Sequence, residues 1–342
     1  MQAGMERYAR QMLLDGFGEQ GQRALARARA VLVGVGALGS HIADSLVRAG
    51  IGHLLLADRD FIELNNLQRQ ALYDEDDLAA NLPKAEAAAR KLRRINSTVT
   101  VEARVMDVNP TNVESLVAGA DVVLDGTDNF STRYLLNDAC VKHGIPWIYG
   151  GVLATYGVTM TIIPGTSACL RCLFREMPPP GSTPTCDVAG ILGPIAKIVG
   201  AFEASEAIKL LSGLGKPNPG LLTIDLAENH LERVPAICRV QGCPTCDLEQ
   251  YAFLQSGSGA RAISLCGRDA VHVSVMGEPA VDLAGLSARL RPVAADVAVN
   301  EFMLRFRVEG FEFTVFPDAR AIIKGTQDED LAKSLYARYV GM

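Results

Sequence analysis

The chain has 342 residues, of which 49% are hydrophobic and 21% are charged, and its formal net charge is −6. This length suits two domains, and this composition can bury a sizeable core. The negative net charge argues against broad nucleic-acid binding. The first residues contain no apolar signal core, and no uncharged apolar run reaches about 18 residues. We therefore expect no membrane span and a cytoplasmic location.

Residues 5–28 are expected to form two short helices joined by the turn sequence DGFG at residues 15–18. Both helices precede the first strand, so they should lie outside the core of the sheet. The first helix carries Arg10 within the polar and aromatic stretch RYARQ, residues 7–11. By itself this pattern indicates a surface helix.

A valine-rich run at residues 30–33 predicts a buried strand, which leads into GVGALG at residues 34–39 and then into a helix. Gly34, Gly36 and Gly39 have the G-x-G-x-x-G spacing of a phosphate-binding turn. In such a turn the glycines allow a tight bend, close approach of a phosphate and close packing of the helix. The helix N-terminus attracts an anion. The sequence therefore predicts a nucleotide site in a Rossmann-like, doubly wound and mostly parallel α/β sheet.

Asp58 ends the next predicted strand, about 20 residues past the glycine turn, where an acidic side chain commonly binds a ribose. The segment that follows, residues 60–70, is unusually polar for a dinucleotide-binding fold. In this segment Arg69 offers a bidentate donor to a phosphate. Lys84 stands on the first turn of a helix expected over residues 83–94, where it can reach a phosphate as a point charge.

Another strand, residues 121–124, leads into DGTDN at residues 125–129. This sequence falls at the carboxyl edge of the sheet, where open α/β folds bind their ligands. Asp128, in a polar loop beside a phosphate site, is a natural Mg²⁺ ligand. Alternatively, it caps the helix expected over residues 130–143. Further strands are expected at about residues 99–105, 146–150 and 156–163.

Two C-x-x-C pairs stand in the second half of the chain: Cys169, Cys172, Cys243 and Cys246. Four thiolates at this spacing suit a tetrahedral structural zinc ion. Residues 173–242 separate the pairs, so tertiary structure must bring them together. Cys238 lies near the second pair and is a competing ligand.

The proline-rich residues 175–186 have no helical or strand period and predict a mobile crossover loop. Cys186 ends this loop, just before a helix expected over residues 191–211. A helix N-terminus lowers the pKa of a thiol, so Cys186 is a candidate nucleophile. The alternative is a small buried residue.

The chain is expected to divide into an α/β domain, a linker and a small α+β domain. The last of these should contain strands near residues 262–266, 270–276 and 302–316 and a closing helix near residues 328–339. The expected boundaries are 1–248 for the first domain, 249–261 for the linker and 262–342 for the small C-terminal domain.

These motifs, in this order, resemble the ThiF/MoeB branch of the ubiquitin-activating superfamily over about residues 5–248. The resemblance implies ATP- and Mg²⁺-dependent adenylation of the C-terminal Gly-Gly carboxylate of a ubiquitin-like sulfur-carrier protein, with release of pyrophosphate. It places Asp58 on the ribose, makes Asp128 the Mg²⁺ ligand, and implies that Asn66, Arg69 and Lys84 contact phosphates. The nucleotide-binding residues that it implies are Gly34, Gly36, Gly39, Asp58, Asp60, Asn66, Arg69, Gln70, Lys84, Asp128 and Asn129.

The same resemblance implies a homodimer in which Arg10 reaches the ATP of the partner subunit. It matches Cys186 to a loop cysteine that can bond covalently to the carrier during sulfur transfer. It also implies a sulfurtransferase or a cysteine desulfurase as a further partner. The residues with catalytic roles are then Arg10, Arg69, Lys84, Asp128 and Cys186.

The C-terminal part favours the ThiF-type enzymes of thiamine synthesis. WIYGG at 147–151, FTVFPD at 313–318 and IKGT at 323–326 look like the longer enzymes of that type, and no rhodanese loop follows Cys266. A MoeB-like activator of the carrier subunit of molybdopterin synthase remains the alternative. An NAD-dependent oxidoreductase would share the glycine turn but would leave Lys84 and the zinc cysteines unexplained.

Overall fold

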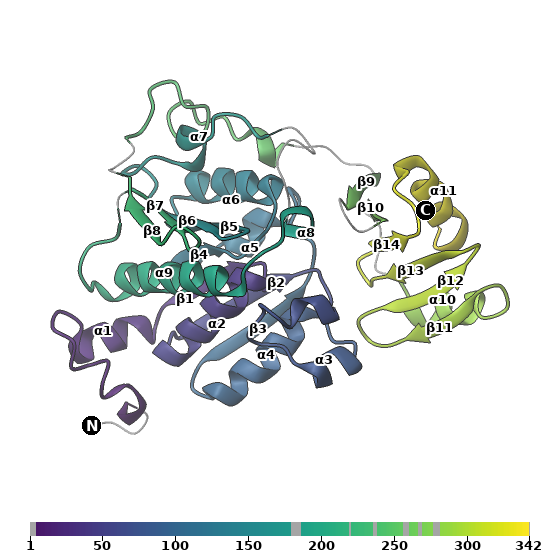
Figure 1. Ribbon diagram of the computed structural model, residues 1–342, viewed down its shortest axis with the longest axis horizontal. Coiled ribbons are helices and arrows are strands. Elements are labelled where there is room, and N and C mark those ends of the chain that lie inside the picture. The colour runs from purple at the N-terminus through teal and green to yellow at the C-terminus, as the bar shows by residue number, and fades with distance from the viewer. Residues whose placement is uncertain are drawn as a thin grey trace. The chain divides into compact units, whose positions relative to one another are not determined.

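The computed structural model divides into two compact units, Met1–Ser256 and Gly257–Met342 (Figure 1). Each unit is described by itself. For residues 186–187, 260–265 and 274–275 only the backbone is described. The described residues are 5–178, 186–218, 220–234, 238–255, 260–265, 269–275 and 281–341.

The first unit is built on an eight-stranded sheet with the strand order β3-β2-β1-β4-β5-β6-β7-β8. Neighbouring strands are parallel from β3 to β5 and antiparallel from β5 to β8. The strand order reverses between β1 and β4, and this switch point is where open α/β sheets bind ligands. The strands are β1 Arg29–Val33, β2 His53–Asp58, β3 Thr100–Val105, β4 Val122–Asp125, β5 Trp147–Leu153, β6 Tyr156–Ile162, β7 Leu221–Asp225 and β8 His230–Arg233.

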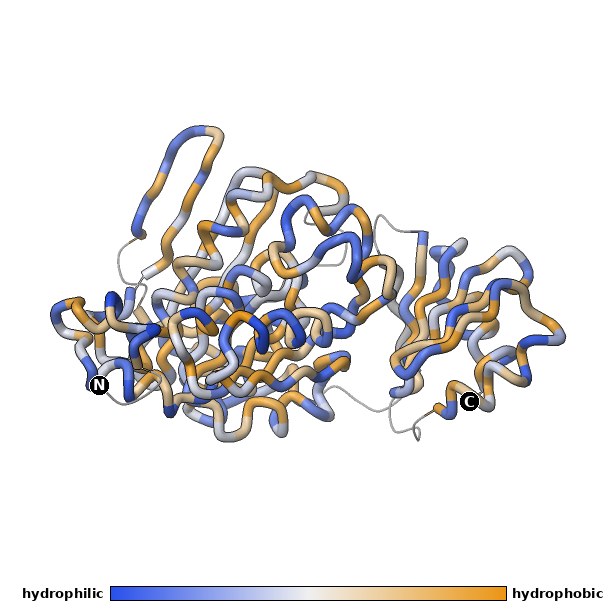
Figure 2. The backbone as a smooth tube through the Cα atoms, turned by 90° about the horizontal axis from the view of Figure 1, so that it is seen from below, coloured by the Kyte–Doolittle hydropathy of each residue, from blue (hydrophilic) through white to orange (hydrophobic). Residues whose placement is uncertain are grey.

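Helices cover both faces of this sheet because alternate strand residues point to opposite sides. Ala30 and Leu32 of β1 pack with helices α2, α4 and α9, whereas Val31 and Val33 pack with α5 and α6. Figure 2 shows hydrophobic residues in orange and hydrophilic residues in blue alternating along the chain. The helices are α1 Gly18–Leu25, α2 Ala37–Ala49, α3 Glu75–Ala79, α4 Lys84–Ile95, α5 Val113–Val117, α6 Phe130–His143, α7 Leu170–Leu173, α8 Cys186–Ala189 and α9 Gly193–Ser212, with 3₁₀ turns η1 Glu6–Tyr8, η2 Leu64–Asn66 and η3 Ala252–Leu254.

The expected α/β sheet and its principal helices are confirmed, but the prediction for the N-terminal segment is partly wrong. Residues 6–8 form only a 3₁₀ turn, and from residue 5 onward α1 is the one α-helix before β1. The reason is that tertiary contacts with the end of α2 fix the conformation of this segment. Tyr8 packs its ring on Gly50, where an added Cβ would lie 2.4 Å from the ring. Gln11 donates from Nε2 to the Ala49 carbonyl (3.0 Å), so the segment lies along the end of α2.

Strands β7 and β8 were not predicted. They extend the sheet as an antiparallel hairpin, and β8 is exposed along its length, so no hydrophobic period marks it. In the described part of the chain, no helix is both long and apolar enough to cross a bilayer.

The second unit contains a six-stranded antiparallel sheet with the order β11-β12-β13-β14-β10-β9. Its core packs Phe306 and Phe313 against apolar side chains of α10 and α11. The single strand run expected over 302–316 is a hairpin, because Glu309 and Gly310 both have positive φ (52° and 86°) and turn the chain. The elements are β9 Ala260–Leu265, β10 Ala270–Val275, α10 Leu283–Leu290, β11 Ala295–Val299, β12 Leu304–Val308, β13 Phe311–Val315, β14 Ala321–Lys324 and α11 Glu329–Tyr339.

Candidate functional site

The glycine loop, residues 34–39, lies against the loop that follows β4. A Cβ on Gly34, whose φ is +84°, would lie 2.6 Å from the Gly126 carbonyl oxygen. A Cβ on Gly39 would lie 1.9 Å from the Gly34 carbonyl oxygen, and one on Gly126 would lie 2.2 Å from that same oxygen. These backbones are therefore in contact at the switch point of the sheet, and no larger residue fits at any of the three positions.

Gly36 marks the open side of the glycine loop. The nearest atom to a Cβ placed there is Nε2 of Gln70, at 3.7 Å. Gly36 is also the N-cap of α2, and no side chain caps the helix. The first N–H groups of α2 therefore have no side-chain acceptor, and this is the arrangement that binds phosphate at a helix N-terminus.

Asp58, at the end of β2, forms a hydrogen bond with the backbone of the glycine loop. Its Oδ2 accepts a hydrogen bond from the Val35 N–H (2.6 Å), and its Oδ1 accepts one from the Asp60 N–H (2.7 Å). Burial raises the pKa of Asp58, and the nearby Lys84 ammonium opposes this shift. The carboxylate expected to bind a ribose therefore also shapes the loop expected to bind phosphate.

Lys84 begins α4 and lies beside the same loop. Its side chain is 5% exposed, and its Nζ lies 3.0 Å from Oδ2 of Asp60. Burial lowers the pKa of Lys84, but the charges of Asp60 and Asp58 outweigh burial and leave this pKa raised. The Tyr73 hydroxyl lies 2.7 Å from the Val35 carbonyl oxygen and 3.1 Å from that of Lys84. Lys84 is therefore a charged group held against the glycine loop.

Arg59 is a functional candidate that sequence reasoning missed. Its Nη1 lies 2.7 Å from Oδ1 of Asp107, and its Nε lies 3.8 Å from Oδ1 of Asp60. Burial lowers the pKa of Arg59, but the neighbouring carboxylates outweigh it and raise this pKa. The signal was available in the sequence: an arginine stands between two aspartates directly after a strand.

Acidic and basic side chains are interleaved in this region. Asp128 lies within electrostatic reach of both Arg59 and Lys84. Carboxylates and cationic groups are therefore interleaved here, and Asp128 is also in reach of Arg133. The carboxylates are those of Asp58, Asp60, Asp107 and Asp128.

Asp128 and Asn129, the two residues after Thr127, have different roles. Asn129 is the N-cap of α6, and its Oδ1 accepts a hydrogen bond from the Thr132 N–H (2.9 Å). The alternative in which Asp128 caps this helix is therefore wrong. Asp128 is exposed, and within the described residues its carboxylate forms no hydrogen bond or ion pair. Its oxygens are free to bind a ligand.

A buried ion pair that the sequence did not reveal lies behind this loop. Arg133 of α6 donates from Nε to Oδ2 of Asp125 (3.0 Å) and from Nη2 to the Thr127 carbonyl (2.8 Å). Oδ1 of Asp125 accepts from the Thr127 N–H (2.9 Å) and hydroxyl (2.6 Å). The guanidinium lies 5.5 Å from the ring of Phe130 and 5.4 Å from that of Tyr149.

The polar segment after β2 supplies three of the expected residues. Asn66 is buried and shapes its own loop: its Oδ1 accepts from the Glu63 N–H (3.1 Å), and its Nδ2 donates to Oδ1 of Asn65 (2.7 Å). Arg69 donates from Nη1 to the Asn65 carbonyl (2.6 Å) and is half-buried. Gln70 lies beside the glycine loop, and within the described part of the chain its buried Oε1 has no hydrogen-bond partner.

Arg10 does not join this group. Its segment lies along the C-terminal end of α2, where Tyr8 and Gln11 contact Gly50 and Ala49. The glycine loop lies at the other end of α2, which has 13 residues and so is about 20 Å long. Within one chain Arg10 therefore lies far from the loop.

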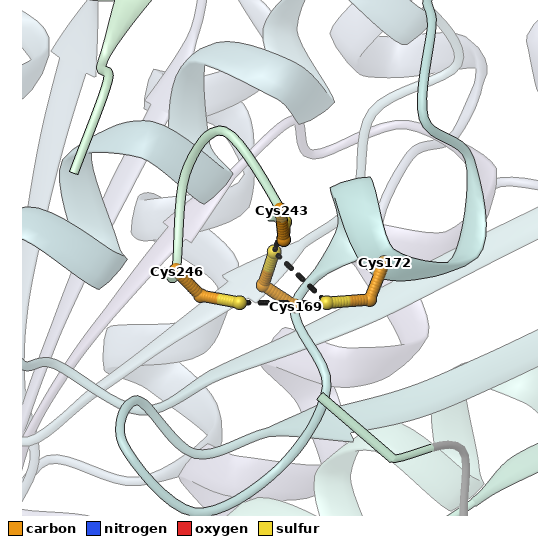
Figure 3. A group of neighbouring side chains, drawn as sticks. All are labelled: Cys169, Cys172, Cys243 and Cys246. Atoms are coloured by element: carbon orange, nitrogen blue, oxygen red, sulfur yellow. Dashed lines mark hydrogen bonds between the residues drawn. The ribbon is translucent and has the colours of Figure 1, made fainter. Parts of the chain in front are cut away.

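The four cysteines of the two C-x-x-C pairs meet in one cluster (Figure 3). Their sulfur atoms all lie within 4.8 Å of one another. The separations are 3.9 Å for Cys169–Cys172, 3.6 Å for Cys169–Cys243 and 3.4 Å for Cys172–Cys246. Thiolates at 2.3 Å from a tetrahedral zinc ion would be about 3.8 Å apart, so the cluster fits that ion. Cys238 is exposed and is not part of the cluster.

Helix α6 supports both cysteine turns. Oδ1 of Asn137 accepts from the Leu170 N–H at the first turn (2.8 Å). Asp138 accepts from the Thr245 hydroxyl inside the second turn (2.7 Å) and from the Phe253 N–H beyond it (3.1 Å). The helix that begins at the nucleotide side of the sheet thus positions the cluster as well.

Cys186 begins the short helix α8. Its thiol lies outside the described residues, and so does part of the expected crossover loop at residues 175–186. The cap of the following helix α9 is Leu192, which offers no side-chain hydrogen bond.

Known proteins resemble this chain in sequence and structure. The ThiF family model matches residues 8–245. The sulfur carrier protein ThiS adenylyltransferase of Bacillus subtilis is 42% identical over 336 residues, which covers 98% of this chain and 99% of that protein. The SAMP-activating enzyme E1 of Haloferax volcanii is 42% identical over 243 residues, 71% of this chain and 88% of that protein. The structure of E. coli MccB with ATP aligns with a TM-score of 0.58 and 26% identity over 66% of this chain and 69% of that one. The chain therefore belongs to the ThiF family.

Proposed function

We propose that the protein transfers the adenylyl group of ATP to the C-terminal Gly-Gly carboxylate of a ubiquitin-like sulfur carrier of the ThiS type. The observation that carries this proposal is the similarity to the ThiS adenylyltransferase of Bacillus subtilis over 98% of the chain. That similarity spans both compact units, whereas the similarity to the SAMP-activating enzyme spans 71% of the chain. The full-length match favours a ThiS-type carrier, and hence thiamine thiazole synthesis, over the molybdopterin-synthase carrier of a MoeB-like activator.

The site supports a triphosphate above the glycine loop. The N-terminus of α2 at Gly36 is uncapped and open, so it offers N–H donors and a positive partial charge. Asp58 binds the ribose from the end of β2. Lys84 and Arg69 bind phosphates, and Gln70 can donate from Nε2, the atom nearest to a Cβ placed at Gly36.

Three other residues complete the proposed nucleotide site. Asn66 and Asn129 shape the loops on either side of it through hydrogen bonds to backbone N–H groups. Asp60 keeps Lys84 in place. We propose that these three residues contribute to nucleotide binding indirectly, because they hold the loops and the lysine of the site in place.

The group of carboxylates near Lys84 fits a divalent cation. Asp128 is the group with free oxygens, so we assign it to Mg²⁺. When bound, Mg²⁺ supplies positive charge to the triphosphate. The carrier carboxylate, ionised at neutral pH, attacks the α-phosphorus, and pyrophosphate leaves. Lys84 and Arg69 hold phosphate oxygens as their charge develops, so this step needs no nucleophile from the protein.

We further propose a homodimer in which Arg10 completes the site of the partner subunit. Arg10 lies about the length of α2 from its own glycine loop, so it cannot serve that loop. The same segment exposes two neighbouring leucines, Leu13 and Leu14, at 74% and 52%. Adjacent exposed apolar side chains are typical of a subunit contact.

The remaining assignments concern sulfur and zinc. We assign a structural zinc ion to Cys169, Cys172, Cys243 and Cys246 on the basis of the sulfur separations. We propose that Cys186 bonds covalently to the carrier: its thiolate attacks the carbonyl carbon of the carrier acyl-adenylate, AMP leaves, and a thioester forms. We propose that a sulfurtransferase or a cysteine desulfurase provides the sulfur. The proposed location is cytoplasmic.

Carrier-dependent exchange of pyrophosphate into ATP tests the adenylation. Lys84→Ala is expected to lower the exchange rate at least about 100-fold, because a preorganised charge at the phosphates is lost. The exposed Lys216→Ala is the matched control and should leave the rate unchanged. A carrier without its Gly-Gly end should support no exchange. Wild-type exchange in a folded Lys84→Ala protein would contradict the assignment.

The same assay separates the alternatives. A panel of purified carriers shows whether a ThiS-type or a molybdopterin-type carrier gives the faster exchange. A thermal shift with ATP but none with NADH argues against an oxidoreductase, because a ligand stabilises the native state that binds it.

A further inference from the structure

In the loop between β4 and α6, Gly126–Asn129, every residue except Asp128 is fixed by hydrogen bonds or close backbone contacts. Gly126 is pressed against the glycine loop, and Asn129 caps α6. The N–H and hydroxyl of Thr127 both donate to Asp125, and its carbonyl accepts from Arg133. The Thr127 carbonyl belongs to the peptide group that leads into Asp128. Arg133 therefore sets the plane of the peptide from which the Asp128 side chain emerges.

Arg133 is itself buried and in contact with several groups. It is 6% exposed, and its partner Asp125 is completely buried. Aromatic rings of Phe130 and Tyr149 lie on the guanidinium at 5.5 and 5.4 Å. A planar guanidinium can bind a carboxylate and a carbonyl at the same time, which a lysine ammonium on a flexible stem does not reproduce.

We propose that Arg133 is a positioning residue for adenylation: by holding the Thr127 carbonyl it fixes the orientation of Asp128 toward the metal–nucleotide complex. The inference rests on the proposed function, in which Asp128 binds Mg²⁺. Arg133 does not touch the nucleotide in this scheme. It acts through the loop, in the way that outer residues around a metal orient its ligands.

The test measures binding of α,β-methylene-ATP by calorimetry, without carrier, in the presence and absence of Mg²⁺. Arg133→Lys keeps the charge beside Asp125 but loses the bridge to Thr127. We expect its dissociation constant for the Mg²⁺ complex to rise about 10-fold, with the metal-free affinity unchanged. Arg171→Lys is the matched control, because Arg171 also lies over a ring, that of Phe253 (5.5 Å), but does not contact the loop.

A double-mutant cycle distinguishes positioning from a general structural role. If Arg133 acts through Asp128, Arg133→Lys should weaken binding no further in an Asp128→Asn background. Additive effects, equal weakening with and without Mg²⁺, or wild-type affinity in Arg133→Lys would each overturn the inference. If Arg133→Lys does not fold, the pair Arg133→Met with Asp125→Asn removes both buried charges and allows the same measurement.

The outcomes also separate this inference from the proposed function. A wild-type protein that binds no ATP, or that exchanges no pyrophosphate with any carrier, refutes the function itself. A wild-type protein that binds and exchanges, with an Arg133→Lys variant of unchanged Mg²⁺-dependent affinity, refutes the inference and leaves the function standing.

Discussion

A buried glutamate on α9 gives a prediction about stability and pH. Glu203 is completely buried, and within the described residues neither carboxylate oxygen has a hydrogen-bond partner. It packs on Gly150 of β5, where an added Cβ would lie 1.9 Å from Oε1. Burial raises the pKa of Glu203 well above 4.5, Asp125 raises it further, and Arg133 only partly opposes this. At pH values below this raised pKa the folded protein therefore holds the side chain in its neutral form.

The sign and size of the effect follow from linkage. Unfolding releases Glu203 into water, where it ionises above about pH 4.5. Below about pH 4.5 Glu203 is neutral in both the folded and the unfolded protein, so it adds no pH dependence to the free energy of unfolding. As the pH rises toward the raised pKa of the folded state, the free energy of unfolding falls by about 1.4 kcal/mol per pH unit because of this one group. Glu203→Gln has nearly the same shape and cannot ionise, so it should remove this slope.

The assay is urea unfolding of the two proteins from about pH 5.5 to about pH 6.5. The single tryptophan, Trp147, is buried in the same strand as Gly150 and reports on this unit by its fluorescence. We expect Glu203→Gln to gain about 1.4 kcal/mol relative to the wild type over this interval. Glu19→Gln, at a side chain that is 61% exposed, is the control. Parallel stability curves for the wild type and Glu203→Gln would refute the reasoning.

Two further predictions concern the cysteines. Cys243→Ser should lower the zinc content from about one ion per chain to none, as measured by atomic absorption. It should also lower the melting temperature by more than about 5 °C, because the ion stabilises only the folded cluster. A variant with full zinc content would exclude the four-cysteine site. Cys186→Ala should retain pyrophosphate exchange and lose a thiol-labile carrier conjugate on a non-reducing gel, whereas retention of the conjugate would leave Cys186 as a small structural residue.

The parts of the fold that depend on local patterns were predictable from the sequence. The valine-rich strand, the glycine spacing and the helix that follows lie close together along the chain, so they identify the nucleotide side of the sheet. The paired C-x-x-C motifs identified a cluster because zinc ligation demands a fixed spacing within each pair. The strand run at residues 302–316 was detected, but its turn was missed because one of the two turn residues is Glu309 rather than a glycine.

The interactions that were missed depend on distant residues. Arg133 is an ordinary first-turn arginine of a predicted helix in sequence, and only the fold shows that it pairs with Asp125 behind the loop. Glu203 has the pattern of a surface residue, but α9 packs it onto a glycine of β5. The position of Arg10 follows from contacts of its neighbours with the end of α2. Helical or strand periods contain no information about such tertiary partners.

The cysteine cluster joins parts of the chain that are far apart in sequence. A break at any point between Cys172 and Cys243 would leave one cysteine pair on each fragment. After a break before Gly193 the fragments would also share the β6–β7 ladder and the packing of α9 on α2. A protease that cuts between Cys172 and Gly193 would therefore produce two bands on a denaturing gel but a single particle in gel filtration, in which the proposed zinc ion would link the fragments.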